Sequence, residues 1–141
     1  MEERLVSYIY CFNELEDYFL CHEYGESLWL DSGRPVMLKG LIQAAVCLYH
    51  LHGGNARGGW RMWSRARTYL SDTKNYQGID IEQLITDIDE VWQHVPEQWR
   101  HETVSIAQVK SLQLPSVKIR YLDPQLETVV QSWTLPPLET D

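Results

Sequence analysis

Hydrophobic residues recur at intervals of three and four positions over residues 5–95, a spacing that predicts a series of amphipathic helices. Capping and turn residues separate the segments: Asn13 follows the first, residues 31–35 follow the second, and Gly53 and Gly54 follow the third. Asn55 can cap the fourth. We therefore expect helices within residues 5–13, 15–30, 36–52, 55–70 and 80–95.

The third and fifth segments indicate how these helices pack. Residues 40–56 carry no charged side chain, so the third helix should lie at the centre with neighbours on both sides. Asp80 and Gln83 have the spacing of a capping box, which would begin the most clearly amphipathic helix of the chain. Five helices joined by short turns favour an antiparallel bundle.

The helical pattern weakens beyond Pro96. Residues 99–113 could hold one more helix, and residues 117–121 alternate like a short strand. We expect the remaining tail to be an extended arm laid over the bundle and anchored by Trp133. The predicted fold is all-α: one domain over residues 1–141, a compact antiparallel bundle of about five or six helices with an extended C-terminal arm. Within this domain, residues 79–95 are expected to form the amphipathic helix and residues 96–141 a C-terminal extension.

The composition of the 141 residues, 44% hydrophobic and 23% charged, is that of one globular domain. A net charge of −8 argues against a protein that coats nucleic acid. However, residues 34–78 hold 7 basic and 1 acidic side chains, so the net charge conceals a basic middle third.

Several observations bear on the cellular compartment. The first residues lack the basic start and apolar run of a secretory signal, so we expect a cytoplasmic location. Cys11, Cys21 and Cys47 form no Cys-x-x-Cys pair and are expected to be buried as small hydrophobic residues. The apolar part of residues 40–56 is shorter than the roughly 18 residues that a bilayer requires, so no membrane association is predicted.

Two polar residues fall within a hydrophobic stripe of the second predicted helix. His22 and Glu26 are one turn apart, and a stripe of this spacing is expected to face the core, where the two side chains can touch. A buried carboxylate needs a partner, and Gln43 and His50 on the third helix are the candidates. The stripe as a whole comprises Leu15, Phe19, His22, Glu26 and Trp29.

An ordered series of short motifs resembles a known family. The motifs are Phe12-Asn13, Asp17-Tyr18-Phe19, His22-Glu23, Glu26, Trp29, residues 40–45, Tyr49-His50, Gly54-Asn55 and Arg57-Gly58. Over residues 8–72 they resemble the family catalogued as domain of unknown function 309. The resemblance implies a small all-helical bundle. It also implies a possible activity, because the family has sometimes been labelled a predicted metal-dependent hydrolase. It also implies that the family's polar positions are His22, Glu23, Glu26, Gln43 and His50.

Two main hypotheses account for the polar cluster. In the first, His22, Glu26 and His50 bind a divalent metal ion and Glu23 acts as the general base for a bound water. In the second, which we favour because buried polar groups usually satisfy one another, the cluster binds no cofactor. His22, Glu26, Gln43 and His50 would then form a buried hydrogen-bond network. A pocket for a small ligand is the third alternative.

The fourth predicted helix carries a basic stripe. Arg57, Arg61 and Arg65 recur every fourth residue beside Trp60, an arrangement that could bind an acidic partner or a nucleic-acid strand. Alternatively, these arginines pair with acids of the fifth helix, for example Asp87, Asp89 and Glu90. Trp60 and Trp63 cannot face the same side, so one of them could mark a partner surface.

No arrangement of nucleophile and base supports an enzyme. Ser27 and Ser64 have no histidine at helical spacing, and the glycines at 53–59 lack the strand and lysine of a phosphate loop. We therefore expect a non-enzymatic interaction or scaffold module with a protein or other acidic partner, nucleic acid being disfavoured. The alternative function is a metal-dependent hydrolase.

Overall fold

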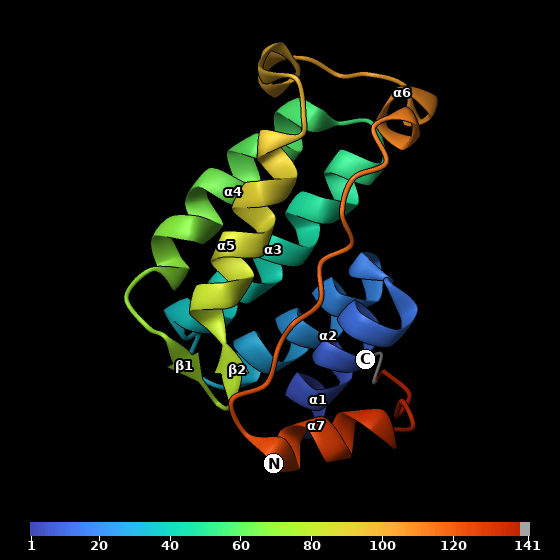
Figure 1. Cartoon of the computed structure of the whole chain (residues 1–141). Coiled ribbons are helices and arrows are strands. Elements are labelled where there is room, and N and C mark those ends of the chain that lie inside the picture. Colours follow the sequence, from blue (N-terminus) through green and yellow to red (C-terminus); the bar gives the residue numbers. More distant parts are fainter. Residues whose placement is uncertain (139–141) are drawn as a thin grey trace.

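The computed structural model describes residues 1–138, and its architecture is all-α, as predicted (Figure 1). The elements are α1 (Glu3–Tyr10), a π-helical segment η1 (Cys11–Leu15), α2 (Tyr18–Asp31), α3 (Val36–His52), α4 (Ala56–Leu70), β1 (Asn75–Tyr76), β2 (Ile79–Asp80), α5 (Ile81–Gln93), a 3-10 segment η2 (Glu97–His101), α6 (Ile106–Ser111) and α7 (Pro124–Gln131). β1 and β2 pair antiparallel and form a small hairpin at the start of α5.

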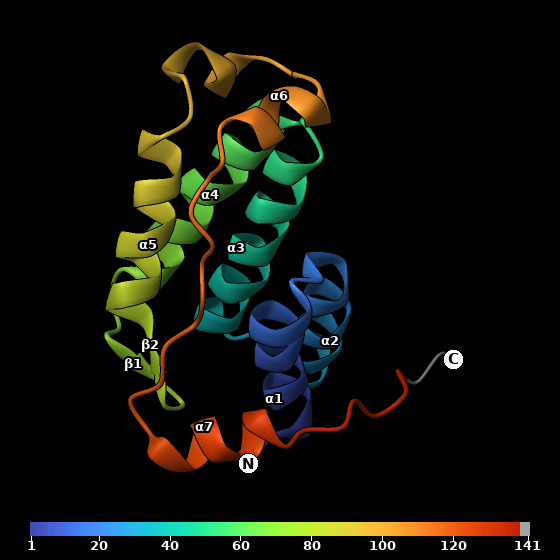
Figure 2. The same cartoon turned by 45° about the vertical axis from the view of Figure 1, so that its right-hand side comes forward.

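α3 is the central helix, with α1 and α2 on one side and α4 and α5 on the other (Figure 2). Its buried residues come from both faces and include Leu38, Leu41, Cys47 and Leu51. Gly40 allows the closest approach to α4, because an added Cβ would lie 2.8 Å from Leu70 Cγ. The prediction that this helix packs on both sides is confirmed.

The ends of α3, α4 and α5 follow the capping signals in the sequence. Gly54 has a φ of +90° just beyond α3, and the Asn55 side chain accepts a hydrogen bond from Gly58 N to cap α4. Asp80 caps α5 by accepting from Gln83 N. The reciprocal half of the predicted capping box is not formed, because the Gln83 amide donates to Asp87 instead.

The chain between α1 and α2 stays helical for longer than the sequence suggested. α1 continues into the π-helical segment η1, and Glu16 then takes a left-handed conformation with a φ of 49°. Asp17 next caps α2 by accepting a hydrogen bond from Leu20 N. This corner places Leu15 and Glu16 on the molecular surface.

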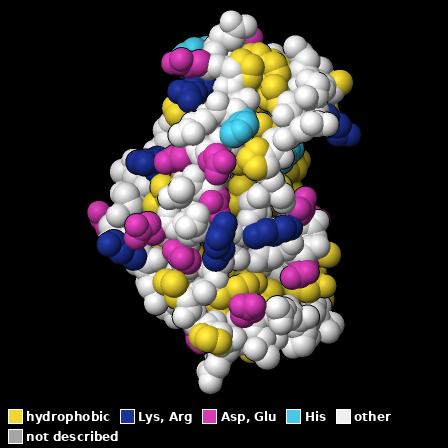
Figure 3. Space-filling view, viewed as in Figure 1, with side chains coloured by type: hydrophobic (Ala, Val, Ile, Leu, Met, Phe, Trp, Pro, Cys, Tyr) yellow, Lys and Arg dark blue, Asp and Glu magenta, His cyan; other side chains and the backbone are white. Residues whose placement is uncertain are grey.

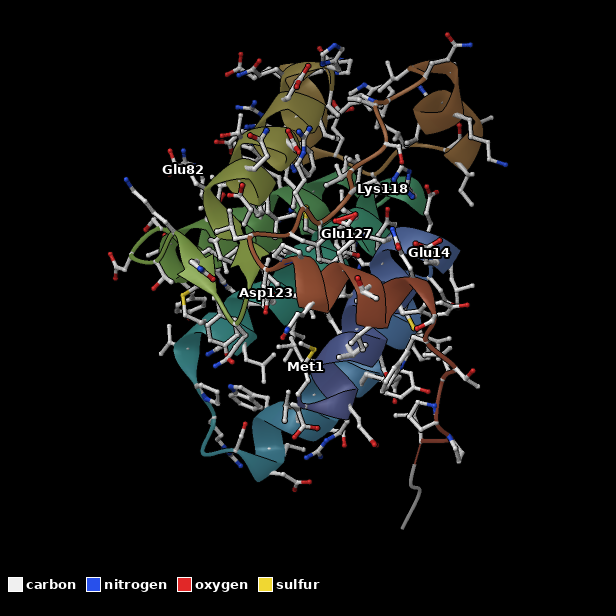
Figure 4. All side chains as sticks on the ribbon, turned by 60° about the horizontal axis from the view of Figure 1, so that its bottom comes forward. Met1, Glu14, Glu82, Lys118, Asp123 and Glu127 are labelled. Atoms are coloured by element: carbon white, nitrogen blue, oxygen red, sulfur yellow. The ribbon has the colours of Figure 1, made fainter. Side chains whose placement is uncertain are left out.

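The C-terminal extension departs most from expectation. The single helix predicted at 99–113 is two short pieces, η2 and α6, and residues 117–121 form only an isolated bridge between Tyr121 and Ile79. α7, which packs on α1, was not predicted from the sequence (Figure 4). Lys118 of the arm lies beside Glu14 and Glu127 around one hollow of the surface (Figure 4).

The arm runs along the bundle from α6 to α7 (Figure 1). Beyond α7, the predicted anchor Trp133 contacts α1, where its Nε1 donates to Ser7 Oγ at 3.0 Å. Val117 and Ile119 of the arm are buried against the bundle. No helix of the described chain has the length and apolar character needed to cross a membrane.

Candidate functional site

The predicted inward stripe of α2 is largely exposed, so this prediction is wrong for all its residues except Trp29, which packs partly buried against the core. Phe19 is 53% exposed and Leu15 46% exposed. The buried side of α2 is instead made by Tyr18, Cys21, Tyr24, Gly25 and Leu28. Small residues decide which side packs: a Cβ at Gly25 would lie 2.7 Å from Ile42 Cγ1, so only this side lets α2 approach α3 so closely. Cys21 and Gly25, four positions apart, were the overlooked signal.

His22 and Glu26 do touch, as expected, but on the surface. His22 Nε2 lies 2.8 Å from Glu26 Oε2, and His22 Nδ1 lies 3.3 Å from Glu23 Oε1. The His22 and Glu26 side chains are 35% and 46% exposed. The interaction is therefore that of an exposed helix pair, which typically contributes a few tenths of a kcal/mol. Glu23, the proposed general base, is engaged with the same imidazole.

Gln43 and His50 do not complete a network with this pair. Gln43 Oε1 is buried and has no hydrogen-bond partner among the described residues. His50 Nδ1 instead lies 3.4 Å from Asn55 Nδ2, at the end of α3. Within residues 1–138 no hydrogen bond connects His22 or Glu26 to either residue, so the predicted buried network is not formed. Its premise, an inward-facing His22 and Glu26, was wrong.

The residues assigned to a metal centre lie on different parts of the surface. His22, Glu23 and Glu26 line a hollow next to Arg4, between the start of α1 and α2, whereas His50 lines another hollow at the far end of α3. The described part of the chain contains no group of three or more His, Cys, Asp or Glu side chains that could hold a metal ion. The side chains present do not fit the divalent metal that the resemblance implied.

The basic stripe of α4 is present and exposed. Arg57, Arg61 and Arg65 are exposed, and in residues 1–138 none of them forms an ion pair or a side-chain hydrogen bond. Of the three acids that were expected to pair with them, Asp87 and Asp89 have other partners. Asp89 binds Arg67, with Oδ2 3.0 Å from Nη2, and Asp87 lies 3.6 Å from Arg120 Nε.

The face crossed by the C-terminal arm has a different character. There, Lys and Arg side chains lie among Asp and Glu side chains (Figure 3). The α4 stripe, by contrast, consists of arginines alone in a helix that contains no acidic residue.

Neither tryptophan of α4 extends this basic surface, contrary to prediction. The Arg100 guanidinium covers the Trp60 ring at 3.9 Å from its centroid, and Trp60 packs edge-on against Trp92. Trp63 is buried, and its indole N–H donates to Asp89 Oδ1 at 2.8 Å. The exposed surface of α4 is thus defined by the three arginines and not by an aromatic platform.

The fold defines the class of protein: a small all-α bundle in which α3 is central and an extended arm crosses the surface. Residues 5–62 match the model of the family described as Domain of unknown function (DUF309), which confirms the resemblance for this N-terminal part of the chain. Searches of the curated proteins and of the solved structures gave no significant match.

Proposed function

We propose that the protein is a non-enzymatic interaction module that binds an acidic partner through the arginine face of α4, formed by Arg57, Arg61 and Arg65. The supporting observation is that these three side chains are exposed and without an acidic partner among the described residues. In the same helix Arg67 is paired with Asp89.

The arrangement costs the isolated protein some stability. Like charges four residues apart on a helix repel by about 0.2–0.5 kcal/mol per pair, and here Arg61 repels both Arg57 and Arg65. Arg57 also lies in the first turn of α4, where the helix dipole disfavours a cation. A binding partner that supplies carboxylates would offset these costs.

The surface fits a short acidic protein segment better than a nucleic acid. The stripe spans about 12 Å along the helix, since eight residues rise by roughly 1.5 Å each. It has no open aromatic ring on which a base could stack, because Arg100 covers Trp60. A net charge of −8 would also repel a long polyanion.

Fluorescence anisotropy tests the proposal with a labelled peptide of alternating Asp and Glu residues, and with single-stranded RNA of mixed sequence as the competing ligand. We expect the parent protein to bind the peptide, binding to weaken with added salt, and Arg61→Glu to bind several-fold less tightly. Lys110→Glu changes the charge equally at an exposed position on α6 and should bind like the parent. Equal peptide binding by the parent and Arg61→Glu, or preferential binding of RNA, would contradict the proposal.

A further inference from the structure

A second surface feature is independent of the arginine face. A hollow of about 670 Å³ lies where the beginning of α2 meets the end of α3, within the size range of small-molecule sites. Most of its lining residues belong to the motifs Asp17-Tyr18-Phe19, Tyr49-His50 and Gly54-Asn55, which also carry the family resemblance. The residues that line it are Leu15, Glu16, Asp17, Tyr18, Phe19, Tyr49, His50, His52, Gly53 and Asn55.

Aromatic rings form the apolar part of this hollow. Phe19 and Tyr49 are 53% and 50% exposed, although their ring centroids are only 6.1 Å apart. The Tyr18 and His52 rings lie nearly parallel, with centroids 6.0 Å apart and an interplanar angle of 9°. Exposed aromatic side chains that gather in a concave surface are suited to cover the face of a planar ring.

His50 provides a hydrogen-bond donor whose position is fixed by Asn55. Asn55 Oδ1 accepts from Gly58 N, which identifies the other atom of the amide as the Nδ2 donor. This Nδ2 lies 3.4 Å from His50 Nδ1, and a hydrogen bond between them makes Nδ1 the acceptor and leaves the ring N–H on Nε2. His50 therefore offers an N–H group, which recognises an acceptor atom on a ligand.

The charges at the rim disfavour an anionic ligand. Glu16 accepts hydrogen bonds from Lys118 Nζ and Ser116 Oγ, and these keep the pKa of its carboxyl below the usual range. Asp17 adds a second carboxylate in its role as the cap of α2. A phosphate placed here would meet two negative charges, one of which is already paired with Lys118.

We infer that this hollow binds an uncharged planar heteroaromatic ring with an acceptor atom on its edge, of the nucleobase type. The ring would pack on Phe19 and Tyr49, and its edge would accept a hydrogen bond from His50 Nε2. A free nucleoside and an unstacked base of a single strand share this chemistry, and both are included in the test.

Saturation-transfer NMR and calorimetry with adenosine, adenosine monophosphate and a short single-stranded adenine oligonucleotide test the inference on the full chain. We expect adenosine to bind and the monophosphate to bind less tightly because of the acidic rim. Phe19→Ala should weaken adenosine binding roughly tenfold or more, since stacking on an aromatic side chain is lost. His50→Phe keeps a ring but removes the N–H donor and should also weaken binding.

The matched control is Leu122→Ala, which shortens a side chain that is 49% exposed at a distant position and should bind like the parent. Phe19 is exposed, so its variant should fold, as circular dichroism can verify. Binding of the oligonucleotide with the same loss in Phe19→Ala would support a strand as the source of the base. If neither adenosine nor the oligonucleotide bound, or if both Phe19→Ala and His50→Phe bound as the parent does, the inference would be overturned. Arg61→Glu should leave adenosine binding unchanged, which separates this site from the proposed α4 surface.

Discussion

The Asn13 side chain pairs with both backbone groups of Ile119, at the point where the C-terminal arm crosses η1. Asn13 Nδ2 donates to Ile119 O at 2.8 Å, and Ile119 N donates to Asn13 Oδ1 at 2.7 Å. Nδ2 also lies 2.9 Å from the Tyr121 hydroxyl. The amide thus occupies the place of a neighbouring strand and satisfies backbone groups that the arm, lacking a sheet partner there, would otherwise leave unpaired.

Substitution of Asn13 should therefore loosen the arm. We expect Asn13→Ala to lower the free energy of unfolding by about 2–3 kcal/mol, because it leaves partly buried backbone groups of the arm without partners. Urea unfolding measures the loss, and hydrogen exchange should be faster at Ile119. Asn13→Asp retains the acceptor for Ile119 N and should fall between the parent and Asn13→Ala. Unchanged exchange at Ile119 in the alanine variant would refute this role.

Asp89 connects α4 to α5 through two different contacts. It accepts from the buried indole of Trp63 and pairs with the exposed Arg67. We expect Asp89→Ala to lower the free energy of unfolding by about 1–3 kcal/mol, because the buried indole N–H loses its acceptor. Arg67→Ala should cost less than about 1 kcal/mol, since an exposed ion pair contributes little. Equal losses from the two substitutions in urea unfolding would show that the ion pair, and not the indole contact, is the important one.

Acid should remove one contribution to stability at the corner between η1 and α2. The pKa of Glu16 is lowered from its ordinary value of 4.5, mainly by the hydrogen bond from Lys118 and then by that from Ser116. Its contribution is therefore present above pH 4.5 and is lost as the pH falls through the lower pKa of the folded state. We expect Glu16→Gln to be less stable than the parent by at most about 1 kcal/mol at neutral pH, since the pair is exposed.

The measurement is urea unfolding of the parent and Glu16→Gln at a series of pH values. The gap between the two proteins should shrink as the solution is acidified below pH 4.5. Glu14→Gln serves as the control, because the described structure shows no ion pair or hydrogen bond for that side chain. A gap that persists in acid would contradict the assigned pairing with Lys118.

The bundle could be predicted from the sequence because each helix has a local signal. Asn55 and Asp80 cap α4 and α5 as expected, and α3 is central because apolar residues on both of its faces must be buried. The C-terminal part has no such periodicity. α7 does begin with a capping Asp123 followed by Pro124, but a helix of 8 residues has too few turns to establish a pattern.

The candidate site was harder to predict because α2 has apolar residues on two sides. Periodicity alone cannot choose between the side that holds Phe19 and Trp29 and the side that holds Tyr18 and Leu28. The choice depends on how closely Gly25 lets α2 approach Ile42, which is a tertiary contact. Because the wrong side was chosen, His22 and Glu26 were predicted to lie in the core although they lie on the surface. The predicted hydrogen-bond network and metal site both depended on that placement.

We expect the three arginines of the α4 face to lower the stability of the free protein because their like charges repel one another. Arg61→Glu replaces two like-charge pairs, with Arg57 and Arg65, by two opposite-charge pairs at the same spacing. We expect the free energy of unfolding to rise by about 0.5–1 kcal/mol at low salt and the gain to shrink as salt is added. Arg67→Glu on the same helix is the control and should have the opposite sign, because it places a carboxylate against Asp89. If Arg61→Glu instead destabilised the protein, Arg61 would have a structural role and the proposed binding of a partner would lose support.

A rise in stability together with loss of acidic-peptide binding would show that the positive charge at this position is kept for an intermolecular contact.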